Sequence, residues 1–224
     1  MRLAVFDCDG TLVDSQHAII AAMTAAWQAH GLDAPEAQAV RRVVGLPLLD
    51  IIEKLLPGGG PDDFRRLASH YREAFNTLRQ HPDHEEPLFP GTREVLDILD
   101  GANYLLAIAT GKSRRGLRAT LELHGLTDRF MTLKTSDDGP GKPNPDMLIS
   151  AMAEAGAAPS ETVMIGDTSF DMLMAGNAGT MAVGVTWGYH DRQELSEAGA
   201  ARLIEHFAEL PEALDVLYAE HSCP

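Results

Sequence analysis

The sequence has little cysteine and no long hydrophobic run. Cys8 and Cys223 are the only two cysteines in 224 residues, so we expect no disulfide framework, and a reducing cytoplasm suits the chain. No apolar stretch approaches 20 residues, which argues against a membrane-spanning helix. The N-terminus carries one arginine and then an acid at Asp7, which is not the pattern of a signal peptide. We therefore expect a cytoplasmic protein.

Positive charge is also scarce. The chain has 18 Lys and Arg residues against 33 Asp and Glu residues, a formal net charge of -15. Such an excess of negative charge speaks against nucleic acid or an anionic membrane as a partner. If the ligand is itself an anion, local cations have to overcome the field of the whole molecule. At 224 residues, the chain can bury a core, and its length allows one large domain or a domain with an insertion.

Short apolar runs alternate with longer amphipathic segments over most of the chain. We expect strands at 3–8, 104–109, 131–135, 161–165 and 181–185. We expect helices at 92–101, 113–124, 145–156, 169–178, 191–198 and 209–220. Strands that are apolar on both faces and separated by helices indicate a parallel sheet covered on both sides. The pattern predicts an α/β fold with a doubly wound, Rossmann-like sheet, which binds ligands at the carboxyl ends of its strands.

Residues 15–88 interrupt this alternation. The segment has helical periodicity and no run typical of a strand. Gly58-Gly59-Gly60-Pro61 indicates a turn within it, and the proline-containing stretch 81–87 indicates the chain's return. We therefore expect a catalytic core made of residues 1–14 and 89–224, with an α-helical cap at 15–88.

Two acids stand at the end of the first predicted strand, in Asp7-Cys8-Asp9-Gly10-Thr11. Residues i and i+2 of an extended chain point to the same side, so Asp7 and Asp9 should share a space while Cys8 faces away. Two like charges 4 Å apart repel by roughly 4 kcal/mol at an effective dielectric constant near 20. The fold must therefore provide a cation near this pair.

Three further motifs follow the first in order. They are Thr110-Gly111 after the second predicted strand, Lys142-Pro143-x-Pro145, and Gly166-Asp167-x-x-x-Asp171. Any one of them is weak evidence, but four in this order at strand ends form a specific pattern. The chain resembles the haloacid dehalogenase superfamily, and the position of the insert resembles the subclass with an α-helical cap, similar to phosphoglycolate phosphatases. The resemblance spans essentially the whole chain.

The resemblance implies a phosphatase that hydrolyses phosphate monoesters of small metabolites through an aspartyl-phosphate. Asp7 would be the nucleophile and Asp9 the acid and base, with Thr110 and Lys142 completing the catalytic set. Phosphate would be bound by Asp9, Gly10, Thr110, Gly111 and Lys142. The resemblance implies Mg²⁺ on Asp7, the Asp9 carbonyl and Asp167, with Asp171 acting through water, and hard oxygen ligands suit this ion.

Several alternatives stay open at this point. A sugar phosphate mutase would need the cap to grip a second phosphate, for which Arg41, Arg42 and the 45–48 loop are the candidates. A phospho-receiver signalling module is less consistent, because such a domain is shorter and carries its phosphorylated Asp on a middle strand. Lys112 either helps attract phosphate or lies on a solvated helix face. We expect a small phosphorylated metabolite as the partner, whereas a monomer and a homodimer are equally compatible with the sequence.

Overall fold

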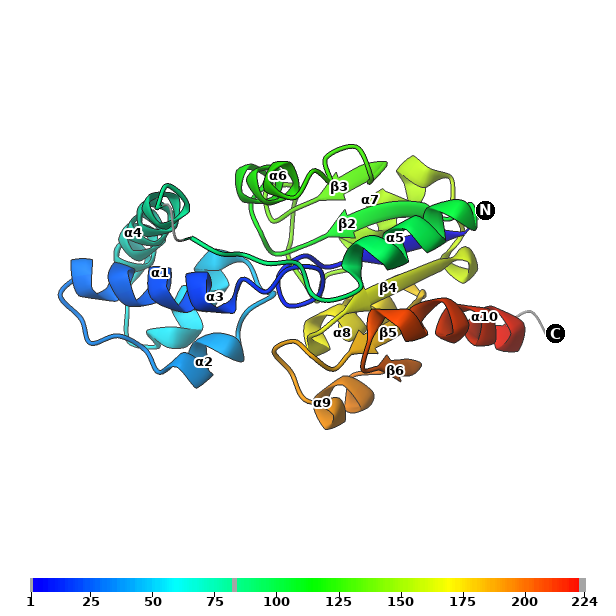
Figure 1. Ribbon diagram of the computed structural model, residues 1–224. Helices are drawn as coiled ribbons and strands as arrows, with labels where there is room; N and C mark the ends of the chain where they lie inside the picture. The colour runs from blue at the N-terminus through cyan, green and yellow to red at the C-terminus, as the bar shows by residue number, and fades with distance from the viewer. Residues whose placement is uncertain (1, 82–83, 222–224) are drawn as a thin grey trace.

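A parallel sheet forms the centre of the molecule (Figure 1). The structure is a computed structural model and describes residues 2–81 and 84–221. The strands are β1 (Leu3–Phe6), β2 (Leu105–Ala109), β3 (Thr132–Lys134), β4 (Thr162–Gly166), β5 (Met181–Val185) and β6 (Arg202–Ile204). They are all parallel in the order β3-β2-β1-β4-β5-β6. The predicted doubly wound α/β fold is confirmed.

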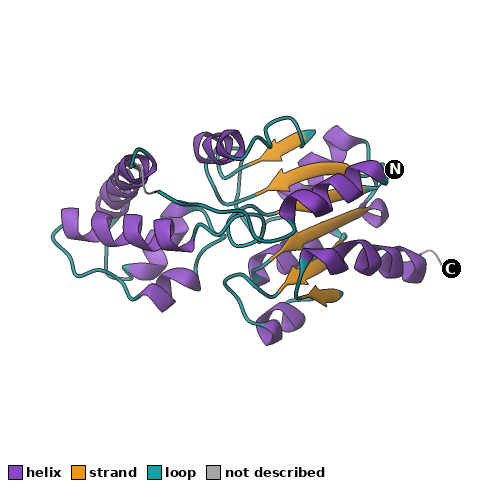
Figure 2. Ribbon diagram, in the orientation of Figure 1, coloured by secondary structure: helices purple, strands orange, loops and turns teal. Residues whose placement is uncertain are grey.

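Helices cover both faces of this sheet (Figure 2). One face packs against α5 (Thr92–Gly101), α6 (Arg114–Leu123) and α10 (Leu210–His221). The other packs against α7 (Asp146–Ala155), α8 (Ser169–Ala178) and α9 (Arg192–Glu197). Short 3-10 turns lie at Pro159–Glu161 and Phe207–Glu209. Successive residues of β1 alternate between the two cores, because side chains of a strand point to opposite faces in turn. Both layers are therefore needed to bury this strand.

The helices between β1 and α5 form a separate layer beyond the carboxyl ends of the strands (Figure 1). They are α1 (Gln16–Ala29), α2 (Ala37–Arg41), α3 (Leu48–Leu55) and α4 (Pro61–Arg79). We call residues 15–88 the cap. Its helices pack around their own apolar cluster, in which the large side chain of Trp27 is fully buried. The predicted turn at 58–61 ends where α4 begins, with Pro61 in the first helical position, where its missing N–H is no loss.

The cap joins the rest of the molecule through two segments that run side by side in opposite directions (Figure 1). The amide of Asp14 donates to the carbonyl of Pro87 at 2.8 Å, and the amide of Phe89 donates to that of Leu12 at 3.0 Å. Val13 and Leu88 form an antiparallel bridge between these bonds. The exit and the return of the chain are thus joined to each other.

The structure corrects two details of the predicted secondary structure. β1 ends at Phe6 rather than at residue 8, because the amide of Cys8 turns back to the carboxylate of Asp7 at 2.6 Å. The edge strand β6 was not predicted, since three residues are too few to show a period. Cys223 and residues 82–83 of the predicted return segment lie outside the described residues. Within the described ranges, no helix combines the length and the apolar character needed to cross a lipid bilayer.

Candidate active site

The predicted site residues come from loops at one edge of the sheet. Asp7 follows β1, Thr110 follows β2 and Asp167 follows β4, three strands that are neighbours in the sheet. Lys142 comes from the loop between β3 and α7, and Asp171 from the first turn of α8. Parallel strands that end together bring these residues into one place although 164 positions separate Asp7 from Asp171 in the chain.

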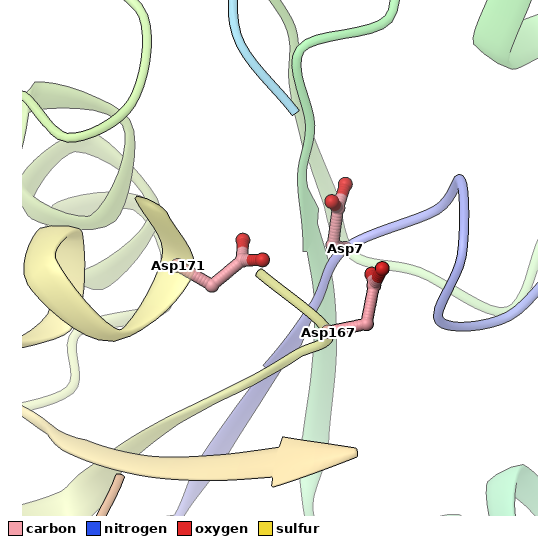
Figure 3. Close-up of side chains that lie close together, drawn as sticks. All are labelled: Asp7, Asp167 and Asp171. Carbon is pink, nitrogen blue, oxygen red and sulfur yellow. The ribbon is translucent and has the colours of Figure 1, made fainter. Parts of the chain in front are cut away.

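Three carboxylates converge there. Oxygens of Asp7, Asp167 and Asp171 all lie within 4.8 Å of one another, and Figure 3 shows the three side chains pointing to a common space. All three residues are buried. Lys142 is buried with them, and its Nζ lies 2.7 Å from Asp7 Oδ2 and 2.6 Å from Asp171 Oδ1. The cluster therefore contains one cation for three acids.

This imbalance of charge changes how the acids titrate. Burial, reinforced by the nearby Asp171, raises the pKa of Asp7 from 3.8 to about 6 although Lys142 opposes the change. Burial and the charges of Asp171 and Asp7 raise the pKa of Asp167 well above its ordinary value. Burial is the larger cause, and the single lysine does not offset it together with the mutual repulsion of the acids. A divalent cation held by oxygen ligands would supply further positive charge, so the donor set fits a metal ion of that kind.

Hydrogen bonds fix the orientation of two of these carboxylates. Asp167 accepts from the hydroxyl of Thr11 at 2.7 Å and from the amide of Tyr189 at 2.9 Å. Asp171 caps its own helix, since Oδ2 accepts from the amide and the hydroxyl of Thr168 at 3.0 and 2.7 Å. Its other oxygen is thereby turned toward Lys142. Tyr189 is not one of the predicted site residues.

Asp9 has a different environment on the cap side of Asp7. Its Oδ1 lies 2.5 Å from Lys112 Nζ and accepts from the hydroxyl of Ser15 at 2.5 Å. Burial alone would raise the pKa of Asp9, but the charge and hydrogen bond of Lys112, with the bond from Ser15, bring it below the ordinary value. Lys112 is therefore not on a solvated face. It is a buried partner of the second acid.

A buried glutamate connects this pair with the cap. Glu86 Oε1 lies 3.8 Å from Lys112 Nζ, while Oε2 accepts from Arg79 Nε of α4 at 3.1 Å. Arg79 also donates to the hydroxyl of Thr120 on α6 at 2.9 Å. Glu86 stands in an acidic, proline-rich stretch of the sequence, which gave no sign of its burial.

Two glycines of the motifs are required by close approaches. At Gly10, φ is +85°, and a Cβ would lie 2.3 Å from the carboxylate of Asp167. At Gly111, a Cβ would lie 2.5 Å from the carbonyl oxygen of Gly45 in the cap. A side chain at the first position would displace a carboxylate, and one at the second would push the cap away from the core.

A cavity of about 330 Å³ opens from Asp7, Asp9 and Thr110 toward the cap. Residues 44–51 and one face of α4 form its outer wall. Arg41 and Arg42, expected from the sequence to grip a ligand, do not line it. The carbonyl of Arg42 instead lies 3.3 Å from His190 Nε2, where the cap rests on the core. The 45–48 loop, the candidate named together with these two arginines, does line the cavity.

Comparison with known proteins gives a consistent result. Residues 4–185 match the family model described as haloacid dehalogenase-like hydrolase. A protein of Dickeya dadantii named "Probable phosphatase IndB" is 35% identical over 99% of this chain and 97% of its own length. A phosphoglycolate phosphatase of Vibrio vulnificus is 32% identical over 97% of this chain and 96% of its own.

The solved structures agree with these matches. The crystal structure of a hydrolase from Pseudomonas syringae superposes with a TM-score of 0.83 at 30% identity, covering 96% of this chain and 99% of that one. The family model spans most of the chain, and the relatives align over nearly their whole length. The chain therefore belongs to the haloacid dehalogenase-like hydrolases.

Proposed function

We propose that this chain hydrolyses phosphate monoesters of small metabolites through an aspartyl-phosphate on Asp7, with Mg²⁺ as the bound ion. It is a phosphoric monoester hydrolase of the haloacid dehalogenase-like family, similar to phosphoglycolate phosphatases. The observation that carries the proposal is the place of the Asp7 carboxylate. It lies beside a buried lysine and two further buried acids, and it also lines the cavity.

Asp7 would attack the phosphorus atom with one carboxylate oxygen. The bond between phosphorus and the ester oxygen breaks, and the departing alcohol takes a proton from Asp9. Asp9 then removes a proton from water, the water oxygen attacks phosphorus, and the bond to Asp7 breaks to release phosphate. One residue can serve in both steps because the alcohol and the water occupy the same cap-side position next to it.

Three other residues would bind the transferred group. The hydroxyl of Thr110 and the amide of Gly111 are available to its oxygens at the end of β2, and Gly10 leaves room for it to approach the backbone. Lys142 would keep Asp7 ionised and share its charge with the incoming phosphate. Each of these groups stabilises charge that is spread over the phosphoryl oxygens during transfer.

Mg²⁺ would be held by Asp7, the carbonyl of Asp9 and Asp167, with Asp171 acting through water. Bound there, the ion would neutralise charge on the phosphate and draw its oxygens toward Asp7. The fit rests on three buried carboxylates served by one lysine and on the preference of this ion for hard oxygen ligands. The thiol of Cys8, free and buried, is compatible with the cytoplasmic location that we also propose.

The test is phosphate release from a panel of phosphorylated metabolites, first with a chelator and then with Mg²⁺ restored. We expect activity only with the metal and none from Asp7→Asn, whose carboxamide is a very poor nucleophile. Circular dichroism should show that Asp7→Asn remains folded. Full activity without a divalent ion would refute the metal assignment, and unchanged rates in Asp7→Asn would refute the nucleophile.

The same panel decides between hydrolysis and a sugar phosphate mutase. A mutase must hold a second phosphate in the cap, and the arginines expected to do so, Arg41 and Arg42, lie outside the cavity wall. Arg72 and Arg79 of α4 do line the cavity, so its wall still offers positive charge for a second phosphate. Release of phosphate would favour hydrolysis, and interconversion of a sugar phosphate without release of phosphate would favour the mutase.

A further inference from the structure

The cavity above Asp7 is larger than a two-carbon acid or a second phosphate requires. Its volume of about 330 Å³ would hold roughly ten water molecules at about 30 Å³ each. This is also near the lower end of the range, about 300–1,000 Å³, typical of pockets that hold drug-sized ligands. Asp7 and Thr110 lie at one end, so most of the space is available to the part of the substrate that leaves as an alcohol.

The cap is already seated on the core in this structure. The backbone of Gly45 approaches Gly111 so closely that no Cβ would fit between them. The Arg79–Thr120 hydrogen bond of 2.9 Å holds α4 to α6, and His190 lies 3.3 Å from the carbonyl of Arg42 on the opposite side. Contacts on both sides of the opening fix the two walls relative to each other. The cavity volume of about 330 Å³ is therefore that of the molecule with its cap in contact with the core.

The outer wall of the cavity is apolar and partly aromatic. Tyr71 and Phe75 lie one turn apart on α4, with ring centroids 5.7 Å apart and a tilt of 50° between the planes. Val44, Leu46 and Leu48 continue this surface from the cap loop. Arg72 and Arg79 of α4 line the cavity as well, so this wall also carries positive charge. The apolar part of the wall suits a ligand with an apolar face.

The facing wall is polar. Lys112 and Ser113 come from the start of α6, Ser136 from the loop after β3, and Asn76 from the edge of the apolar wall. These groups offer both hydrogen-bond donors and acceptors to a ligand edge. A ring with one apolar face and a rim of hydroxyl or carbonyl groups matches the two walls together, because aromatic side chains pack against such faces while polar groups orient the rim.

We propose that the alcohol released by this enzyme is a ring compound of the sugar or nucleoside class, with its apolar face on Tyr71 and Phe75. The proposal rests on the phosphatase function given above and narrows its substrate. The phosphate would lie at Asp7 and the ring would fill the cap half of the cavity. Sugars and nucleosides both have a ring with an apolar face and polar groups at its edge, and the assay below distinguishes between the two classes.

The first test measures kcat/KM with Mg²⁺ for pentose and hexose phosphates, nucleoside 5′-monophosphates, phosphoglycolate and pyrophosphate. We expect the best ring substrate to exceed phosphoglycolate and pyrophosphate at least tenfold, with the sugar and nucleotide arms identifying the source of the ring. Equal or better turnover of phosphoglycolate or pyrophosphate would overturn the inference and leave the phosphatase function standing. No phosphate release from any compound would overturn both.

The second test alters the aromatic wall. Phe75→Ala should lower kcat/KM for the best ring substrate by about 10- to 100-fold and for phosphoglycolate by much less, so that their ratio falls. Phe75→Leu, which keeps apolar volume without the ring, covers the case in which the alanine variant unfolds, and its ratio should fall as well.

Leu78→Ala is the matched control for this test. Leu78 lies on the same helix and packs in the same cap cluster but does not line the cavity, so its loss should lower the melting temperature while the ratio stays constant. Equal losses on ring and non-ring substrates in both Phe75 variants would show that the residue only supports packing, and the inference would fail.

Discussion

The two lysine–carboxylate pairs of the candidate site have similar N–O distances but different surroundings. Lys142 and Asp7 are 2.7 Å apart, Lys112 and Asp9 are 2.5 Å apart, and only two positions separate the acids in the chain. On the sheet side, one lysine serves three buried acids, and the pKa of Asp7 rises to about 6 mainly through burial. On the cap side, Lys112 overcomes the effect of burial and the pKa of Asp9 falls below its ordinary value.

The difference between the two pairs lies in the charge around them. The sheet side has an excess of negative charge that a divalent ion can balance, whereas the cap side is closer to neutral without one. Two aspartates of one short motif therefore have pKa shifts of opposite sign. Distance within a pair does not reveal this, and the number of acids around each lysine does.

Within the cap-side pair, the larger effect should come from removing the acid. Asp9→Asn should lower kcat for ester hydrolysis by about 10²–10⁴-fold, because neither the alcohol nor the water can exchange a proton with an amide. Acetyl phosphate, whose acetate leaves without protonation, should still phosphorylate Asp7. Mass spectrometry of acid-quenched protein should then find phosphate on that residue, and Asp7→Asn, the control, should carry none. Rapid ester hydrolysis by Asp9→Asn would contradict the assignment of proton transfer to Asp9.

Removing the lysine of the sheet side should affect stability most. Lys142→Met leaves three buried carboxylates without their cation, which should cost about 3–5 kcal/mol of unfolding free energy in the absence of metal. Urea unfolding with a chelator measures this loss, and Mg²⁺ should restore part of it by binding the folded state.

Lys134→Met is the matched control for that measurement. Lys134 pairs with Glu154, whose side chain is 54% exposed, so the loss should be about 0–1 kcal/mol. Equal losses in the two variants would mean that the buried cluster depends on its lysine no more than a pair with an exposed carboxylate does.

The raised pKa of Asp7 predicts that metal binding depends on pH. Below about pH 6 this group holds a proton in the metal-free protein, so each ion that binds must displace it. Apparent affinity for Mg²⁺ should fall about tenfold for each pH unit below 6 and level off above 7. Calorimetric titration in buffers of different ionisation enthalpy measures both the affinity and the released proton. A Mg²⁺ affinity that is constant from pH 5 to pH 7 would contradict the predicted competition between the ion and the Asp7 proton.

The raised pKa of Asp7 also determines how its contribution to the free energy of unfolding changes with pH. The folded state holds the Asp7 proton more tightly than the unfolded state does, since the pKa is about 6 in the former and 3.8 in the latter. In the metal-free protein this contribution therefore declines as the pH rises from about 4 to about 6, and metal should offset the decline.

The smallest effect should come from the lysine of the cap side. Lys112→Met should raise the pKa of Asp9 and move the corresponding limb of the kcat/KM profile to higher pH, with a loss of about 10-fold at the optimum. Lys112→Arg, which keeps the charge, should retain the wild-type midpoint. A profile that does not move in Lys112→Met would assign the control of Asp9 to Ser15 instead.

Much of the fold could be predicted from the sequence because its signals are local. The apolar runs that became β1, β2, β4 and β5 fill both cores of the sheet, and parallel pairing then brought Asp7 and Asp167 to one edge. The roles of these residues stay predictions. The partnership of Lys112 with Asp9 and the burial of Glu86 could not be predicted, because both depend on how the cap packs against α6, over distances that no local pattern encodes.

The antiparallel bridge between Val13 and Leu88 has a mechanical consequence. Because the outgoing and returning segments are hydrogen-bonded to each other, they bend as one ribbon with a single axis, and the cap cannot twist on either segment alone. Ser15 and Glu86 flank that ribbon and reach Asp9 directly or through Lys112. A swing of the cap on this ribbon would therefore also move the partners of Asp9, so opening the cavity and changing the surroundings of that carboxylate would be one movement.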